Sequence, residues 1–395
     1  MPAPLTGIKV LDFSRAQQGP YCTVMLSDMG AEILKVEPIE GESGRGIGEE
    51  GQMGIRPYFV AHDRGKKSIT LDLKKEKARE IAYRLVKVCD VVVHNNRPGV
   101  MERLKLDYET VRQINPRIIY AEASGFGSKG AQKTRPAYDI VGQAMGGIMS
   151  ITGEPGGYPL PAGAAIGDQT GAIILAFGVM SALVARERFG VGQKVESSLY
   201  GTIITLQSWE IDHHSITGQV IPKGGRGHPL IPGLWGSFKT ADGYMVIGGV
   251  GDARWGRFCK IMGLEHLEHD PRFEDGIKRR DNANVLRPFA DEAFLKKATD
   301  EWLRLFKEND MICAPVQDFD DVLNDPQSIE NQYIINMDHP HLGSMKIVGC
   351  PIHLTETPEV IQGPPPELGQ NTEEILLEAG YDWDEINALR DEGVV

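Results

Sequence analysis

The 395-residue sequence lacks the features that mark several common protein classes. It has only five cysteines, an odd number without a C-x-x-C pair, which argues against a disulfide framework or a zinc ribbon and favours a reducing compartment. No run of eighteen apolar residues free of charge occurs, and the amino-terminal residues lack the regions of a secretion signal. We therefore expect a soluble, cytoplasmic protein that does not bind membranes.

Basic residues are also in the minority. With 42 basic and 55 acidic residues the formal net charge is −13, which would repel a phosphate backbone, so no nucleic-acid partner is expected. The signatures of P-loop NTPases, α/β-type serine hydrolases and HExxH zinc proteases are absent. The paired histidines lie in patterns that do not favour shared coordination, so no metal is expected. These pairs are His213-His214, His266-x-x-His269 and His339-x-His341.

One glycine motif is present, but it lacks the strand and helix that such a motif needs on either side. Residues 46–51 match G-x-G-x-x-G, yet they follow no expected strand, open no helix and carry two glutamates where a pyrophosphate would need positive potential. The turn after the first expected strand instead contains Gln17 and Gln18, where a nicotinamide enzyme carries its glycines. A dehydrogenase is therefore disfavoured.

The first 125 residues alternate short β-branched runs with helical patterns. Residues 74–88 place apolar side chains three and four apart, which predicts an amphipathic helix. The expected strands are residues 8–13, 33–36, 68–71, 91–94 and 118–122. Strands that alternate with helices predict an α/β fold with a Rossmann-like, doubly wound parallel sheet, whose ligands bind at the loops after the strands.

The chain is longer than one hydrophobic core usually serves, so we expect two domains. A Gly/Pro-rich loop at 146–167 leads into an apolar stretch at 169–188, read as a helix buried on all sides, and a further helix is expected at 196–217. A hairpin is expected at 236–248, and this change from alternating strands and helices marks a domain boundary. The expected boundaries are a large domain at 1–195, a linker at 196–225, a smaller α/β domain at 226–320, a linker at 321–345 and a C-terminal segment at 346–395.

Asp168 stands between the Gly/Pro-rich loop and the apolar helix. One interpretation is an N-cap, whose carboxylate accepts the first helical N–H groups. The same place would keep the carboxylate ionised, and the neighbouring Gly167 would give access to a bulky substrate, so Asp168 is also a candidate nucleophile. The local pattern leaves both interpretations open.

Six motifs follow one another from residue 5 onward. They are Leu5–Phe13, Gly30–Glu37, Gly65–Asp72, Arg97–Leu104, Tyr138–Gly147 and Gly167-Asp168. Together they resemble the class III CoA-transferases of the CaiB/BaiF type, which include formyl-CoA transferase, carnitine CoA-transferase and α-methylacyl-CoA racemase. The resemblance implies a Rossmann-like large domain, a small domain, a C-terminal segment that returns to the large domain, and an interlocked homodimer of ring-like chains.

The resemblance also implies a covalent mechanism. Asp168 would attack an acyl-CoA donor and become an aspartyl-CoA thioester, from which an organic acid acceptor takes the CoA without ATP or a metal. Gln17 would stabilise developing oxyanions, although a polar loop residue is an equal alternative. The glycine-rich loops at 153–163 and 223–227 would exclude water.

Coenzyme A contacts follow from the same likeness. Lys74 and Arg103 would pair with the ADP phosphates, whereas most surface cations are merely solvated. Pro38 stands where some relatives carry arginine. The phosphate contacts of that arginine must therefore be absent here or come from another residue, with Arg97 as a candidate. The full set of expected CoA-binding residues is Gln18, Leu71, Lys74, Asn95, Asn96, Arg97, Arg103 and Tyr138.

Two alternative functions stay open. An acyl-CoA racemase of the same family is expected to carry histidine immediately before an aspartate, but Tyr138 precedes Asp139 here, and an ordinary tyrosine is a poor base at neutral pH. A CoA-binding protein without catalysis is the other alternative. For the acid, we expect a succinyl-type donor and a larger acceptor, bound by the segment around Gly224, Gly225, Arg226 and His228, where the last two either meet a second carboxylate or face solvent.

Overall fold

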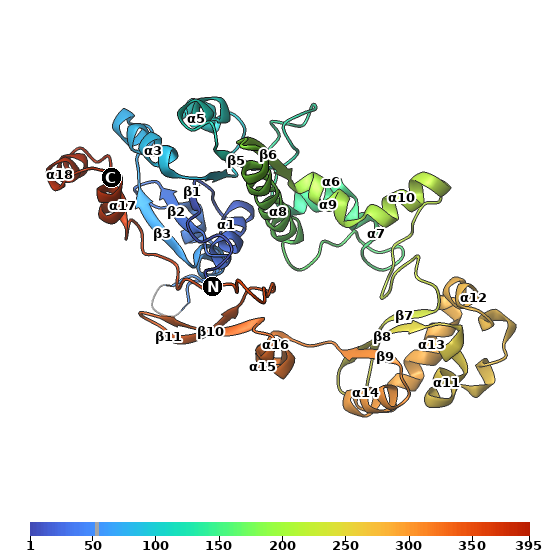
Figure 1. Cartoon of the computed structure of the whole chain (residues 1–395). Coiled ribbons are helices and arrows are strands. Elements are labelled where there is room, and N and C mark those ends of the chain that lie inside the picture. The colour runs from blue at the N-terminus through green and yellow to red at the C-terminus, as the bar shows by residue number, and fades with distance from the viewer. Residues whose placement is uncertain (52–54) are drawn as a thin grey trace. The chain divides into compact units, whose positions relative to one another are not determined.

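The computed structural model describes residues 1–51 and 55–395 and divides the chain into two compact units (Figure 1). The first unit comprises residues 1–146, 162–206 and 325–395, and the second comprises residues 147–161 and 207–324. Residues 147–161 thus lie in the second unit, whereas the expected large domain ran from 1 to 195 without a break.

The first unit is built on a six-stranded sheet in the order β3-β2-β1-β4-β5-β6, in which all neighbours are parallel. Its strands are β1 (Lys9–Asp12), β2 (Glu32–Glu37), β3 (Lys66–Thr70), β4 (Val91–His94), β5 (Ile119–Ser124) and β6 (Gln193–Ser198). The central strands are almost wholly buried, as their β-branched runs require. This confirms the prediction of a parallel α/β sheet.

Helices cover both faces of this sheet (Figure 1). One face packs against α1 (Gln18–Asp28) and α8 (Ile166–Phe189). The other face packs against α3 (Glu76–Val88), α5 (Tyr108–Ile114), α17 (Thr372–Glu378) and α18 (Trp383–Asp391). Residues of α17 and α18 belong to the same core cluster as β1 and β4, so the C-terminal residues are part of the first unit.

The expectation of one helix over residues 196–217 is wrong. The segment instead begins within β6 and continues as α9 (Leu199–Leu206) and α10 (Ser208–Thr217). β6 pairs only with β5 at the edge of the sheet, and its residues are partly exposed. A polar edge strand lacks the buried β-branched run by which the other strands were identified.

The expectation that α8 is buried on all sides is also wrong. One side packs into the core through residues such as Ala172 and Leu175, while Ile173, Phe177 and Val184 are exposed. By length and composition α8 is the one helix in the described part of the chain that could cross a membrane. This is weak support for a membrane span, because core helices of soluble proteins satisfy the same criterion.

The second unit contains an antiparallel sheet with helices on it. The sheet consists of β7 (Leu234–Lys239), β8 (Tyr244–Val250) and β9 (Ile312–Pro315), and β7 and β8 form the predicted hairpin. Its helices are α7 (Ile148–Ile151), α10, α11 (Asp252–Met262), α12 (Gly276–Asp281), α13 (Ala283–Phe294), α14 (Thr299–Glu308) and α15 (Phe319–Asn324). Aromatic side chains, among them Phe238, Phe294 and Trp302, fill its core.

Short elements complete the first unit. They are α2 (Pro57–Asp63), α4 (Val100–Arg103), α6 (Asp139–Gly146), α16 (Pro326–Glu330) and the hairpin of β10 (Ile334–His339) and β11 (Gly343–Val348).

Candidate active site

The ends of β1 and β4 flank the point where the strand order reverses, which is where open α/β sheets bind ligands. Side-chain amides after β4 fix the loop after β1. Asn95 accepts the N–H of Arg15 at 2.8 Å and donates to the Arg15 carbonyl at 2.8 Å. Asn96 donates to the Phe13 carbonyl at 3.2 Å. Both asparagines therefore position the loop that leads to Gln17.

Helix α1 begins at the end of this loop and packs against α8 (Figure 1). Gln17 is its N-cap residue, but its half-buried side chain does not cap the helix. Gln18 is buried, with Nε2 at 3.5 Å from Ser197 Oγ and so close to Gly171 of α8 that a Cβ on this glycine would lie 2.3 Å away. Gly171 is about one turn after Asp168. Gln17 and Gln18 therefore lie at the same end of the packed helices α1 and α8 as Asp168.

Asp168 is the third residue of α8, which begins at Ile166, so the N-cap interpretation is wrong. The cap comes from another helix. Asp139, 29 residues before Asp168, accepts the N–H groups of Gly167 at 2.7 Å and Asp168 at 3.1 Å through Oδ1. The first backbone donors of α8 are thus occupied by Asp139, and the Asp168 side chain is left without them.

A glutamine one turn further along α6 holds Asp139 in place. Gln143 is buried, and its Nε2 donates to Asp139 Oδ2 at 2.5 Å. Its Oε1 accepts the N–H of Ala162 at 2.9 Å. The same side chain therefore connects the capping aspartate with the loop that enters α8.

The electrostatic environment of Asp168 differs from the expected one. Burial, and then the negative charge of Asp139, raise the pKa of the Asp168 carboxyl to about 7 from its ordinary value of 3.8. The expectation that the helix end keeps this carboxylate ionised is therefore wrong, because the helix donors bind Asp139 instead. At neutral pH the group is close to half ionised.

This environment favours acylation of Asp168. A carboxylate with a raised pKa is more basic and holds less water than an ordinary one, so its attack on a carbonyl carbon needs less desolvation. Once acylated, the side chain carries no charge. Acylation therefore relieves both the cost of burying the anion and its repulsion from Asp139, which stabilises a covalent intermediate relative to the free carboxylate.

A pH profile would report this shift. If Asp168 is the nucleophile, kcat/KM should rise with pH through a midpoint near 7, since only the deprotonated carboxylate can attack. Asp139→Asn removes the neighbouring charge but leaves the burial, so the midpoint should move down and still exceed 3.8. Asp382→Asn, at the N-cap of α18, is the matched control and should leave the profile unchanged. An unchanged midpoint in Asp139→Asn would contradict the role given to this charge.

Three expected CoA-binding residues meet in one pocket. Leu71, Lys74 and Asn96 line a cavity of about 330 Å³ formed around the ends of β1, β2 and β3. Arg97 lines a neighbouring cavity of about 510 Å³ over β4, β5 and β6. Met101 borders both cavities, so they adjoin each other.

The other expected CoA-binding residues lie apart from these cavities. Arg103, at the end of α4, and Tyr138, immediately before α6, are exposed, and neither lines the two cavities described. The carboxamide of Asn95 is occupied by the backbone of Arg15, and Gln18 faces α8.

The expected substrate residues lie in the second unit, where the cations have acidic partners. Arg226 forms two hydrogen bonds of 2.9 Å with Asp291. His228 Nε2 lies 2.8 Å from Glu210, and its ring stacks on Trp209.

Gly224 and Gly225, which precede Arg226 in the sequence, connect their loop to the segment that contains Ile151 and Gly153. Gly224 donates to the Ile151 carbonyl at 3.0 Å, and Gly225 donates to the Gly153 carbonyl at 3.1 Å. Within residues 1–51 and 55–395, no cluster of three histidine, cysteine or acidic side chains is placed to hold a metal ion.

Sequence reasoning missed two residues beside Asp168. Asp139 was noticed as part of a motif and as the aspartate that follows Tyr138, but not as a neighbour of Asp168, although its spacing of four from Gln143 indicated that both share one face of a helix. Tyr58 of α2 is the other: burial, followed by the nearby Asp168 charge, raises the pKa of its hydroxyl. No local pattern identified Tyr58, because its proximity to Asp168 is a tertiary contact.

Comparisons with known proteins agree over nearly the whole chain. The family described as CoA-transferase family III matches residues 5–372. The chain is 36% identical to an acyl-CoA transferase of Fusarium pseudograminearum, over 99% of this chain and 88% of that protein. It is 35% identical to the succinyl-CoA:mesaconate CoA-transferase of Haloarcula marismortui, over 96% and 97%. A crystal structure of a CaiB/BaiF family protein from Brucella suis superposes with a TM-score of 0.87 at 30% identity, over 96% of this chain and 100% of that one.

Proposed function

Because this chain belongs to CoA-transferase family III and is a CoA-transferase, we propose that it transfers CoA from a succinyl-type donor to a dicarboxylic acid through a covalent intermediate on Asp168. The observation that carries this proposal is the raised pKa of a carboxyl group in the first turn of α8, beside the carboxylate of Asp139. A carboxylate destabilised as an anion favours its own acylation.

The proposed reaction has four balanced steps. A carboxylate oxygen of Asp168 attacks the thioester carbon of the donor, the C–S bond breaks, and CoA leaves as a thiolate. The thiolate attacks Asp168 Cγ in the resulting anhydride, releases the donor acid as a carboxylate and forms an aspartyl-CoA thioester. The acceptor carboxylate attacks Cγ and expels the thiolate. The thiolate then attacks the acceptor carbonyl, which forms the new CoA ester and regenerates the Asp168 carboxylate.

Each step passes through a tetrahedral oxyanion, for which we propose Gln17 as a hydrogen-bond donor. Its position at the N-terminus of α1, next to Gln18 and hence close to the first turns of α8, supports this role. An uncharged amide suits the task, because a cation would stabilise the free Asp168 carboxylate as well as the oxyanion.

The substrate class is inferred from relatives. Succinyl-CoA:mesaconate CoA-transferase of Haloarcula marismortui and succinyl-CoA:glutarate CoA-transferase of Homo sapiens, the latter 32% identical, both carry a succinyl donor and a dicarboxylic acceptor in their names. For coenzyme A itself we propose the pocket of Leu71, Lys74 and Asn96, with Arg97 in the adjoining cavity. Lys74 is exposed and can reach a phosphate.

A substrate panel tests this proposal. Succinyl-CoA is offered with glutarate, mesaconate or citramalate, and with monocarboxylates of matching length, and the CoA esters are separated by liquid chromatography. We expect kcat/KM at least about tenfold higher for a dicarboxylate than for its monocarboxylate match, a difference of about 1.4 kcal/mol. Asp168→Asn is the control for uncatalysed exchange. Transfer to monocarboxylates alone would overturn the proposed substrate class.

We also propose that the chain forms a homodimer, the interlocked arrangement expected from the family resemblance. The exposed apolar stripe of Ile173, Phe177 and Val184 on α8 supports a partner surface, because a soluble monomer rarely leaves such side chains side by side in water. The cytoplasmic location stays a prediction.

A further inference from the structure

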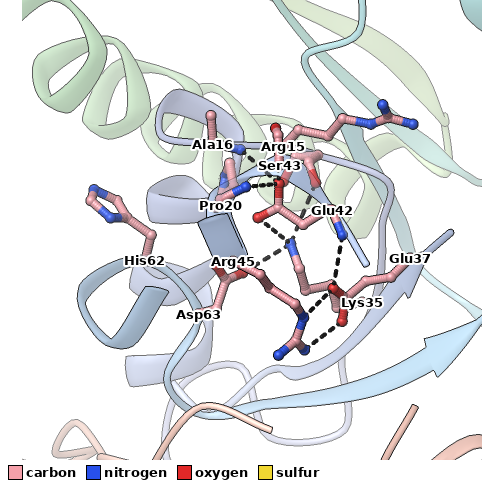
Figure 2. Close-up of polar contacts among 12 residues, drawn as sticks. Arg15, Ala16, Pro20, Lys35, Glu37, Glu42, Ser43, Arg45, His62 and Asp63 are labelled. Carbon is pink, nitrogen blue, oxygen red and sulfur yellow. Dashed lines mark hydrogen bonds and ion pairs between the residues drawn. The ribbon is translucent and has the colours of Figure 1, made fainter. Parts of the chain in front are cut away.

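A cluster of buried charges lies beside the loop that contains Arg15 and Ala16 (Figure 2). Lys35 pairs with Asp63 at 2.9 Å and with Glu42 at 3.6 Å, and all three side chains are almost fully buried. Lys66 pairs with Asp63 at 2.8 Å and with Asp12 at 3.1 Å. These contacts place three carboxylates around two ammonium groups, so one carboxylate exceeds what the two lysines balance.

The cluster is bound to the backbone of the loop after β1. Asp12 accepts the N–H of Ser14 at 2.8 Å, and Lys35 donates to the Ser14 carbonyl at 3.4 Å. Glu42 accepts the N–H of Ala16 through Oε2 at 3.2 Å (Figure 2). The buried charges therefore hold the loop on both sides of Arg15.

Ala16 has an unfavourable backbone conformation. Its φ is +59°, in the left-handed region that residues with a Cβ rarely adopt. The next residue is Gln17, so the direction in which Gln17 leaves the loop depends on this strained turn. The N–H of Ala16 is the group that Glu42 binds, and Glu42 is therefore placed to keep the turn in this conformation.

The two oxygens of Glu42 have different surroundings. Oε2 accepts the N–H of Gly44 at 2.6 Å in addition to that of Ala16. Oε1 is buried and forms no hydrogen bond within the described ranges, and it faces Lys35 at 3.6 Å. A second oxygen that is buried without a hydrogen bond is costly, and the ion pair with Lys35 offsets part of this cost.

We propose that Glu42 is a positioning residue for Gln17: it holds Ala16 in the left-handed conformation from which the Gln17 amide reaches the oxyanion. This inference rests on the proposed role of Gln17. Glu42 itself touches no reacting atom, so its effect passes through the loop.

Removal of Glu42 should be tolerated by the fold. Glu42→Ala leaves two lysines opposite the two aspartates Asp12 and Asp63, so the remaining buried charges balance. We expect kcat to fall about tenfold while KM for succinyl-CoA stays within about twofold. Glu42→Gln keeps an oxygen for the Ala16 N–H and should retain most of the native kcat. Thermal unfolding of each variant shows whether the fold is intact.

A second substitution separates positioning from mere stability. Ala16→Gly adopts a positive φ without strain, so in the Glu42→Ala background it should restore kcat to within about threefold of native. Because Glu42 acts through Gln17, the double variant of Glu42→Ala and Gln17→Ala should be no slower than Gln17→Ala alone.

The outcomes distinguish this inference from the proposed function. If Asp168→Asn transfers CoA at the native rate, the proposed covalent route fails. If Asp168→Asn is inactive but Glu42→Ala keeps native kcat, or Ala16→Gly restores nothing, or the effects of Glu42→Ala and Gln17→Ala multiply, the positioning role alone is overturned. If Gln17→Ala keeps native kcat, the positioning role is overturned as well, since Glu42 would then have no residue through which to act.

Discussion

Asp168→Ala is expected to lower CoA transfer by roughly 10⁴-fold or more, because no other group would accept the acyl chain in the first step. Asp168→Asn should be equally inactive, since the amide keeps the shape of the side chain but is not a nucleophile. Binding of acyl-CoA, measured by calorimetry, should change little. The measurement is the initial rate of succinyl-CoA consumption with a dicarboxylate acceptor.

Glu187→Ala is the matched control, since it removes an exposed carboxylate from the last turn of the same helix. Its rate should equal that of the native enzyme. An Asp168→Asn enzyme with more than a few per cent of native kcat would contradict the covalent role of Asp168.

Asp168→Asn should also be more stable than the native protein at alkaline pH. The folded-state pKa of Asp168 is about 7, above the ordinary 3.8, so the folded protein binds this proton more tightly than the unfolded chain. The stability that the proton contributes is present below about pH 4 and is lost as the pH rises through 7. Asp168→Asn should therefore unfold about 2–4 °C above the native protein at pH 8 and show no such gain at pH 4.

The second large effect is expected from Gly167→Ala. A Cβ at this position would lie 2.9 Å from Asp139 Oδ1 and 3.4 Å from Ile203 Cδ1. Asp139 would have to withdraw from the N–H groups that it caps, and the first turn of α8 would shift with Asp168. A displacement of about 1 Å at a reacting group costs on the order of 100-fold in kcat, which is the loss we expect.

Gly163→Ala is the control for Gly167→Ala. Gly163 lies in the loop that precedes α8, and a Cβ there would meet nothing within 4 Å. Gly163→Ala should keep native kcat, and both proteins should bind acyl-CoA. If Gly167→Ala retains native kcat, the contact between Asp139 and the start of α8 does not position the nucleophile.

Most of the sheet could be predicted from the sequence, because its central strands are buried on both faces and so read as continuous β-branched runs. β4 consists of three valines and a histidine, all buried, and was predicted with its observed bounds. β6 was not predicted as a strand, because it lies at the sheet edge, where polar residues are tolerated. The exposed side of α8 was not predicted either, because its residues are apolar and composition alone does not reveal which apolar side chains are covered.

The candidate site was predicted only in part. Asp168 could be singled out from its place before an apolar helix, but its raised pKa could not, because it depends on tertiary burial and on Asp139, which lies 29 residues away. The same applies to Glu42, whose contact with Ala16 spans 26 residues. Asn95 and Asn96 also hold the loop after β1 through their amide groups, a task that the sequence did not indicate because it depends on the pairing of β1 with β4.

Trapping of the acylated enzyme tests the central claim most directly. The native protein is mixed with succinyl-CoA and hydroxylamine, which attacks an activated aspartyl carbonyl, and the digested chain is analysed by mass spectrometry. We predict loss of activity together with a hydroxamate on Asp168, and neither change when acyl-CoA is omitted. An enzyme that loses its activity while Asp168 stays unmodified, or that keeps full activity throughout turnover in hydroxylamine, would contradict the covalent route.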